Sequence, residues 1–321
     1  MKLTIKQIYD LAIRLGINAD LRGKKRVEKK LKRIKEKYAE LKADEKEIFD
    51  KERLVNPYSD TRILCGKENK KVKRILAGID IDSGEVMLAR QLSKVNDIDL
   101  IVSHHPRGIA LARLDDVMDL QIDLLEDLGI PVNIAENLMK KRMAEVARGV
   151  SAENHYRPID TANLLGMNMM CTHTIADNLV ARFVKKEVER AKPETVGEIM
   201  KVLKNIPEYK EAARRGAGPT IFAGNSDNRC GKIAFTEVTG GTSGHKDIYE
   251  KLAQAGIGTI VGMHMSEEYK EQAEKNHMNV IIAGHMSSDS LGMNLFLDEL
   301  EKKGIEVIPC SGLIRVKRFT K

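Results

Sequence analysis

The sequence predicts an α/β protein with two α/β lobes, mainly parallel strands and a basic helical arm at its N-terminus. Three observations lead to this fold class. The 321 residues exceed one average domain. Beyond about residue 72, short runs rich in isoleucine and valine alternate with helix-length segments, a pattern typical of parallel sheets. Residues 1–75 carry a net charge of +11 and the remainder −4, so the basic excess lies near the N-terminus.

The composition excludes several classes of protein. A hydrophobic content of 42% is enough for a packed core and rules out a largely disordered chain. No run approaches the roughly 18 consecutive apolar residues of a membrane span, and the first ten residues lack the apolar stretch of a secretion signal. The four cysteines are far apart, which predicts free thiols in a reducing cytoplasm. Aromatic residues make up only 4%, which argues against a stacking platform for bases.

Residues 1–55 are predicted to form the basic arm. The densest stretch, residues 22–37, holds ten basic and two acidic residues. Apolar residues recur there at alternating spacings of four and three, which predicts a long amphipathic helix within residues 20–53; they are Val27, Leu31, Ile34, Tyr38 and Leu41. Such a helix either is solvated and docked on its own body or a partner subunit, or binds nucleic acid or an anionic membrane. We favour the first interpretation because charge runs are usually solvated faces.

The first lobe is predicted to span residues 56–190 and the second residues 219–321, with a charged helical bridge at residues 191–218. The breakers Pro193, Pro207 and Gly216 mark this bridge. A helix is expected at residues 84–94 of the first lobe. The predicted strands are residues 74–81, 98–103, 130–134 and 165–171 in the first lobe, and residues 232–238, 258–262, 278–283 and 305–309 in the second.

Two adjacent histidines, His104 and His105, directly follow the apolar run at residues 100–102. Ligands of open α/β sheets bind at the carboxyl ends of the strands. Neighbouring residues that leave a strand point in different directions, so each imidazole can serve a different metal ion. Burying two imidazoles there without partners would be costly.

Two further motifs place a histidine and an aspartate four residues apart, His173 with Asp177 and His285 with Asp289. Positions i and i+4 share one face of a helix, so each pair can aim both groups at one point. Both pairs follow strand-like apolar runs. Imidazole and carboxylate ligands without thiolate suit Zn, Mn, Fe or Co in a catalytic site. A carboxylate also commonly bridges two metal ions that clamp a hydrolytic water.

The motifs S-H-H-P at 103–106, H-T-x-x-D at 173–177 and G-H-x-x-x-D at 284–289 together resemble the NGG-interacting factor three family. That family consists of dinuclear-metal α/β proteins, often described as type 2 GTP cyclohydrolase I. The resemblance extends from about Asn56 to the C-terminus.

The resemblance implies that His104, His105, Asp177, His285 and Asp289 are ligands of two divalent metal ions. It places His173 in the lining of the site. Asp289 stands where the family normally has a glutamate, so bridging two metals requires a closer approach of its helix. His264 lies where the family usually has a Thr-Gly-Glu motif, and it is either a partial replacement for that acid/base group or a surface histidine. The resemblance also implies a ring-shaped homo-oligomer, commonly a hexamer.

The glycine-rich run at residues 240–244 precedes a helix-length segment and permits two interpretations. Backbone N–H groups of such a turn can hold a phosphate. A tight strand-to-helix turn is the interpretation we favour, because the run lacks the lysine of a phosphate-binding loop.

These observations predict a metal-dependent hydrolase that acts on a small phosphorylated or nucleotide-like compound. A metal-activated water would attack the substrate, and His173 or His264 would move the proton. The alternative is a metal-binding or regulatory protein without turnover. A nucleic-acid partner for the basic arm is not favoured, and no membrane partner is expected.

Overall fold

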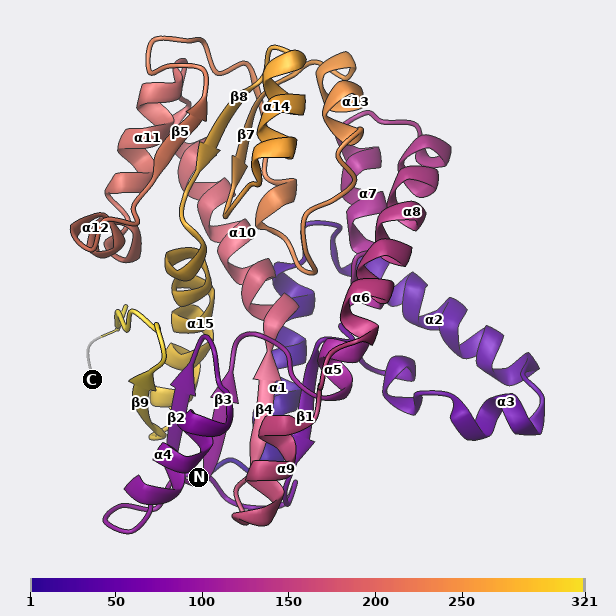
Figure 1. Cartoon of the computed structure of the whole chain (residues 1–321), viewed down its shortest axis with the longest axis vertical. Helices are drawn as coiled ribbons and strands as arrows, with labels where there is room; N and C mark the ends of the chain where they lie inside the picture. The colour runs from indigo at the N-terminus through magenta and orange to yellow at the C-terminus, as the bar shows by residue number, and fades with distance from the viewer. Residues whose placement is uncertain (1, 320–321) are drawn as a thin grey trace.

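A computed structural model describes residues 2–319 of the chain and shows two sheets joined by long helices (Figure 1). The predicted fold class, two α/β lobes with mainly parallel strands and a basic helical arm, is confirmed. The strands are β1 (Thr61–Cys65), β2 (Arg74–Gly78), β3 (Leu100–Ser103), β4 (Met169–Thr172), β5 (Thr220–Ala223), β6 (Lys232–Ala234), β7 (Ile257–Gly262), β8 (Asn279–Ile282) and β9 (Glu306–Cys310).

The helices cover both sheets and connect them. They are α1 (Ile5–Ala19), α2 (Lys24–Glu40), α3 (Ala43–Ile48), α4 (Ser83–Leu92), α5 (Ile109–Ala112), α6 (Leu114–Val117), α7 (Leu120–Asp127), α8 (Val132–Ser151), α9 (Arg157–Leu164), α10 (His173–Ala191), α11 (Val196–Lys204), α12 (Pro207–Arg214), α13 (Ile248–Gln254), α14 (Glu267–Lys275) and α15 (His285–Glu301), with the 3-10 helices η1 (Lys51–Leu54) and η2 (Thr236–Val238). No helix within residues 2–319 is long and apolar enough to cross a membrane.

The first sheet has the order β1-β4-β3-β2-β9, and all of its neighbours are parallel except the edge pair β1 and β4. Strands β3 and β4 are buried along their whole length, as expected for strands of a parallel sheet that is covered on both faces. Strand β9 comes from the end of the chain and pairs with β2, so the C-terminal segment completes the first sheet.

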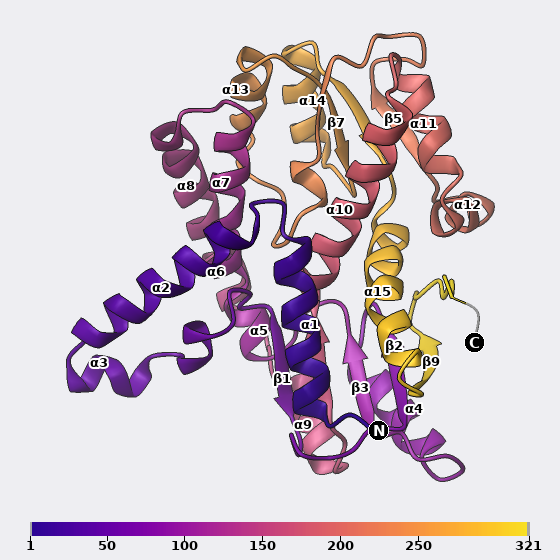
Figure 2. The same cartoon turned by 180° about the vertical axis from the view of Figure 1, so that it is seen from behind.

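The second sheet has the order β5-β8-β7-β6, with an antiparallel edge strand β5 and parallel pairs otherwise. Helices α10 and α15 begin directly after strands of different sheets, α10 after β4 and α15 after β8. They pack against each other and run between the two sheets (Figures 1 and 2). The two helices therefore bring residues from both sheets to one place.

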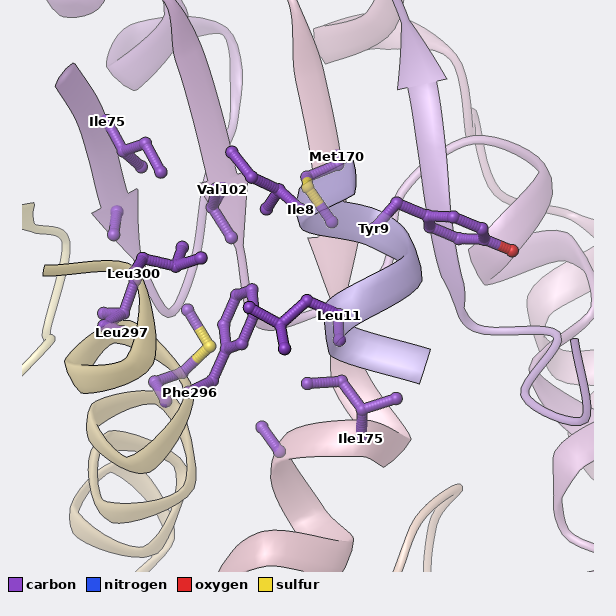
Figure 3. Packing of buried hydrophobic residues seen from close by; sticks show 14 of the residues in the cluster. Ile8, Tyr9, Leu11, Ile75, Val102, Met170, Ile175, Phe296, Leu297 and Leu300 are labelled. Carbon is purple, nitrogen blue, oxygen red and sulfur yellow. The ribbon is translucent and has the colours of Figure 1, made fainter. Parts of the chain in front are cut away.

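The N-terminal region divides into a core helix and a projecting arm. Helix α1 packs Ile8 and Leu11 against the first sheet and α15, where they lie near Val102 and Phe296 (Figure 3). Helices α2 and α3 project from the body as a hairpin (Figures 1 and 2). The projecting arm is therefore shorter than the predicted residues 1–55, because α1 belongs to the core. The long helix predicted within residues 20–53 is two helices, α2 and α3.

Six of the expected strands correspond to observed strands, and a seventh, at 165–171, overlaps β4 only at its end. The strand predicted at residues 130–134 is wrong, since Pro131 caps α8 there. The buried residues Ala135 and Met139 continue at helical spacing, and this periodicity outweighs the short apolar run. Edge strands β1 and β5 were not predicted.

Candidate metal centre

Three histidines emerge from neighbouring strand ends of the first sheet. His104 and His105 follow β3, and His173 is the first residue of α10 after β4. In the parallel pair of these strands, Ser103 lies opposite Cys171, so both strands end at the same edge. The backbone N–H groups of His104 and His105 donate to the carbonyls of Gly78 and Ile79, which ties the turn to β2.

The carboxylates come from the two long helices. Asp177 lies one turn into α10 and Asp289 one turn into α15, after His285 at the start of α15. Gly292 allows the two helices to approach closely, because an added Cβ would lie 2.3 Å from the carbonyl oxygen of Ala176. This contact lies one turn beyond Asp289.

Each of the three first-lobe imidazoles is anchored through Nδ1. His104 Nδ1 lies 3.4 Å from the carbonyl oxygen of Thr172. His105 Nδ1 lies 2.7 Å from Asp80 Oδ1, and His173 Nδ1 lies 2.8 Å from Asp60 Oδ2. An anchor of this kind fixes the tautomer and leaves Nε2 available for a metal ion.

Asp289 lies between these imidazoles and is almost fully buried. Its Oδ1 is 3.4 Å from His104 Nε2, and its Oδ2 is 3.5 Å from both His105 Nε2 and His285 Nε2. Neither carboxylate oxygen has a hydrogen-bond partner among the described residues, and His104 Nε2 has none either. Buried polar groups without partners are rare and costly, and these three atoms are positioned so that they could hold a cation.

The ligand atoms fall into three overlapping groups that could each hold a metal ion, with all atoms of a group within 4.8 Å of one another. Two of the groups share Asp289. The groups are His104 with Asp177 and Asp289, His105 with His285 and Asp289, and His104 with His105 and His173. The donor set of imidazoles and carboxylates therefore fits a divalent metal ion.

The electrostatics of the site favour a charged Asp289. Burial alone would raise the pKa of its carboxyl, but the imidazoles of His104, His105 and His285 hold that pKa well below its ordinary value. The pKa of His105 is raised to about 9; burial opposes the increase, and the nearby carboxylates of Asp289 and Asp80 outweigh it. In the absence of metal, a protonated His105 thus compensates the buried carboxylate.

Burial sets the direction of the pKa shifts of Asp177, His285 and His264. It raises the pKa of Asp177 to about 6 and lowers the pKa of His285 to about 4. Burial also lowers the pKa of His264. The pKa of His173 is raised, because the carboxylates of Asp177 and Asp60 outweigh the effect of burial. Metal binding needs neutral imidazoles beside an ionised carboxylate, so it must displace the proton that His105 carries in the metal-free protein.

A small cavity of about 30 Å³ separates this cluster from a wall formed by the second lobe. His264 is part of the wall, and its ring centroid lies 4.7 Å from that of His285. Glu237 in η2 also lines the cavity, and burial raises the pKa of its carboxyl to about 7. The remaining wall residues include Thr236, Thr239, Gly241, Thr242, Ser243 and Met263.

All seven residues selected from the sequence lie at this site. His104, His105, His173, Asp177, His285 and Asp289 make up the groups that could hold a metal ion, and His264 lines the cavity. Sequence reasoning missed three acidic residues, Asp60, Asp80 and Glu237. Asp80 follows β2 at the same sheet edge and could have been found from its strand-end position. No comparable signal marked Asp60, which precedes an unpredicted strand, or Glu237.

The glycine-rich run at residues 240–244 contributes to the cavity wall, and side chains of α7 and α8 donate hydrogen bonds to its carbonyls. Gln121 Nε2 donates to the carbonyls of Gly240 and Thr242, and Arg142 Nε donates to the carbonyl of Ser243. Gly241 has a φ of +91° and contacts Met118 closely. The run is therefore a tight packed turn, as favoured from the sequence.

No protein-family model matches the sequence, and no curated protein matches it. Among solved structures, a NIF3 superfamily protein from Sphaerobacter thermophilus is 23% identical, covers 98% of this chain and 100% of its own, and superposes with a TM-score of 0.76. Reduced HcgD from Methanocaldococcus jannaschii is 13% identical, with coverage of 77% and 87% and a TM-score of 0.44. A hypothetical protein from Staphylococcus aureus is 14% identical, with coverage of 82% and 92% and a TM-score of 0.44.

The match at 0.76 extends over nearly the whole chain, the arm included. It agrees with the family resemblance carried by the three histidine motifs. This protein therefore has the fold of the NIF3 superfamily, the family named for NGG-interacting factor three.

Proposed function

We propose that the protein is a hydrolase that depends on two divalent metal ions. The observation that carries this proposal is Asp289, a buried carboxylate whose two oxygens lack hydrogen-bond partners and face different imidazoles. Such a carboxylate is suited to bridging two cations. His104 and Asp177, with His173 beside them, would complete one ion's ligands, and His105 and His285 those of the other.

A pair of divalent ions supplies a water of lowered pKa for attack and stabilises the charge that develops on the substrate. The chain's own residues orient the ligands and handle protons. His173 is held by Asp60 on one side and faces Asp177 on the other, at 3.8 Å, so it is better placed to bind metal than to move a proton. His264 and Glu237 line the cavity without an ion-pair partner among the described residues, and we assign the proton transfer to them.

The proposed substrate is a small phosphoester or a nucleotide-like compound. The cavity of about 30 Å³ has room for a few waters only, so the second-lobe wall must move for a substrate to enter. The same small volume favours the second candidate function, a metal-binding or regulatory protein without turnover.

Hydrolysis assays on metal-restored protein separate these two candidates. The probes are p-nitrophenyl phosphate, bis-p-nitrophenyl phosphate and GTP, each with Zn²⁺, Mn²⁺, Fe²⁺ or Co²⁺. The proposal predicts turnover that is lost in Asp289→Asn together with the metal, and reduced in His264→Asn with the metal retained. A protein that holds two ions per chain and hydrolyses none of the probes would support the binding role.

A homo-oligomeric ring, in particular a hexamer, is a further proposal that rests on the family resemblance alone. Light scattering tests it directly, with an expected mass of about six times the 36.0 kDa chain. A monomeric mass would reject it.

A further inference from the structure

A groove of about 640 Å³ lies between the body and the arm, which we define as α2 and α3. One wall is the arm itself, and the other is formed by α6, the residues around Asp119 and α8. The lining residues are Lys30, Arg33, Ile34, Lys37, Tyr38, Leu41, Phe49, Arg53, Asn56, Pro57, Ser59, Asp116, Asp119, Glu136 and Met143.

One face of α2 carries a row of four basic residues. Arg26, Lys30, Arg33 and Lys37 follow the spacing i, i+4, i+7 and i+11, which places them in one stripe along the helix. We call these four residues the basic stripe. Three of them, Lys30, Arg33 and Lys37, line the groove.

The two residues of the basic stripe nearest the body form ion pairs, and the two nearest the tip of the arm form none among the described residues. Arg26 pairs with Asp127 at 3.0 Å, and Lys30 pairs with Asp119 at 2.6 Å. Arg33 and Lys37 have no acidic partner among residues 2–319. The outer end of the groove therefore presents two unpaired cations.

The acidic residues of the opposite wall do not cancel these cations. Asp116 is shared by Arg53 and Arg113, and Glu136 pairs with Lys140. Asp119 is already occupied by Lys30. The groove thus has a positive balance where the arm projects furthest from the body (Figures 1 and 2).

The floor of the groove is apolar and partly aromatic. Tyr38 and Phe49 pack with ring centroids 4.8 Å apart, and Ile34 and Leu41 lie beside them. A basic groove with partly exposed apolar and aromatic side chains matches the chemistry of a single nucleic-acid strand, whose phosphates are anionic and whose bases are unpaired. A duplex would hide its bases from such a floor.

We propose that the groove binds single-stranded nucleic acid, with Arg33 and Lys37 contacting consecutive phosphates. A second copy of the chain is a poorer occupant, because the acidic residues of α7 and the preceding Asp119 that would attract the arm are already paired with its own Arg26 and Lys30. The inference is independent of the metal centre, since no metal-binding residue lines the groove.

The test measures fluorescence anisotropy of a labelled twelve-nucleotide oligouridine with the full chain at several salt concentrations. The double variant Arg33→Glu/Lys37→Glu is compared with Lys29→Glu/Lys35→Glu, which changes the charge equally on the same helix outside the groove. Circular dichroism verifies that both variants keep their helices. A chelator-treated sample tests independence from metal.

The proposal predicts that Arg33→Glu/Lys37→Glu weakens binding more than tenfold and the control pair less than threefold. Loss of two phosphate contacts reduces the slope of log affinity against log salt by about 1.4. Binding in the chelator-treated sample is expected to be unchanged. The proposal is overturned if the wild-type chain does not bind, if both variants weaken binding equally, or if a duplex of the same length binds as tightly through the same residues.

Discussion

The metal centre and the arm carry charge in opposite environments. Asp289 is almost completely buried and its carboxylate has no hydrogen-bond partner within residues 2–319, whereas Lys32 and Glu36 of α2 form an ion pair with side chains 78% and 58% exposed. A buried charge is costly unless a partner completes it, and an exposed one is screened by water. The number of charges in a region therefore says little about its specificity for a ligand. Burial and the geometry of the partners decide it.

The largest effect is expected at the shared ligand. Asp289→Asn keeps the shape of the side chain but removes the charge that both metal groups use. Loss of an outer-shell partner typically costs 10–100-fold in metal affinity, so loss of this ligand should exceed about 100-fold. Competition with a chromophoric chelator measures the affinity, with Glu299→Gln on the same helix as the control. Unchanged affinity in Asp289→Asn would contradict the assignment.

A smaller effect is expected at the carboxylates that hold the imidazoles. Asp60 is fully buried and anchors His173, whereas the side chain of Asp80 is 54% exposed and anchors His105. We predict that Asp60→Asn lowers metal affinity by about tenfold or more and that Asp80→Asn lowers it by less. The same chelator competition ranks the two variants. A larger loss of metal affinity in Asp80→Asn than in Asp60→Asn would show that burial of the anchoring carboxylate does not determine its effect.

The stability of the metal-free protein should fall as the pH rises from 7 to 8.5. The folded-state pKa of His105 is about 9, above its unfolded value of about 6.5, so its contribution is complete below pH 6.5 and is lost towards pH 9. Over this window the loss is about 1–2 kcal/mol. Urea unfolding of chelator-treated protein measures it, and His105→Gln should flatten the dependence. A stability that increases over this window would refute the assigned pairing.

The smallest effect is expected on the arm. Lys32→Ala removes one member of the exposed pair with Glu36 and should change the free energy of unfolding by less than about 0.5 kcal/mol. Urea unfolding at pH 7 is again the measurement. A loss above about 1 kcal/mol would mean that exposed charge on α2 supports the fold, which would weaken the contrast with the buried site.

The sequence was sufficient to predict the fold class and all of the imidazoles at the site. Parallel strands are continuous apolar runs, and the residues at which these runs end can be located in the sequence. It did not predict β1 or β5, which are edge strands with partly exposed residues and weak patterns. Asp60 lies immediately before β1, so missing the strand also meant missing the residue. The role of Gly292 depends on its distance from Ala176 across two helices, which no local pattern contains.

We propose that the chain holds two metal ions that share Asp289. The most direct measurement is the metal content per chain, by plasma mass spectrometry, of protein purified without chelators and then dialysed against Zn²⁺ or Mn²⁺. The account predicts close to two ions per chain in the wild type and one or none in Asp289→Asn. A wild-type chain that retains no metal after reconstitution, or two ions retained by Asp289→Asn, would contradict it.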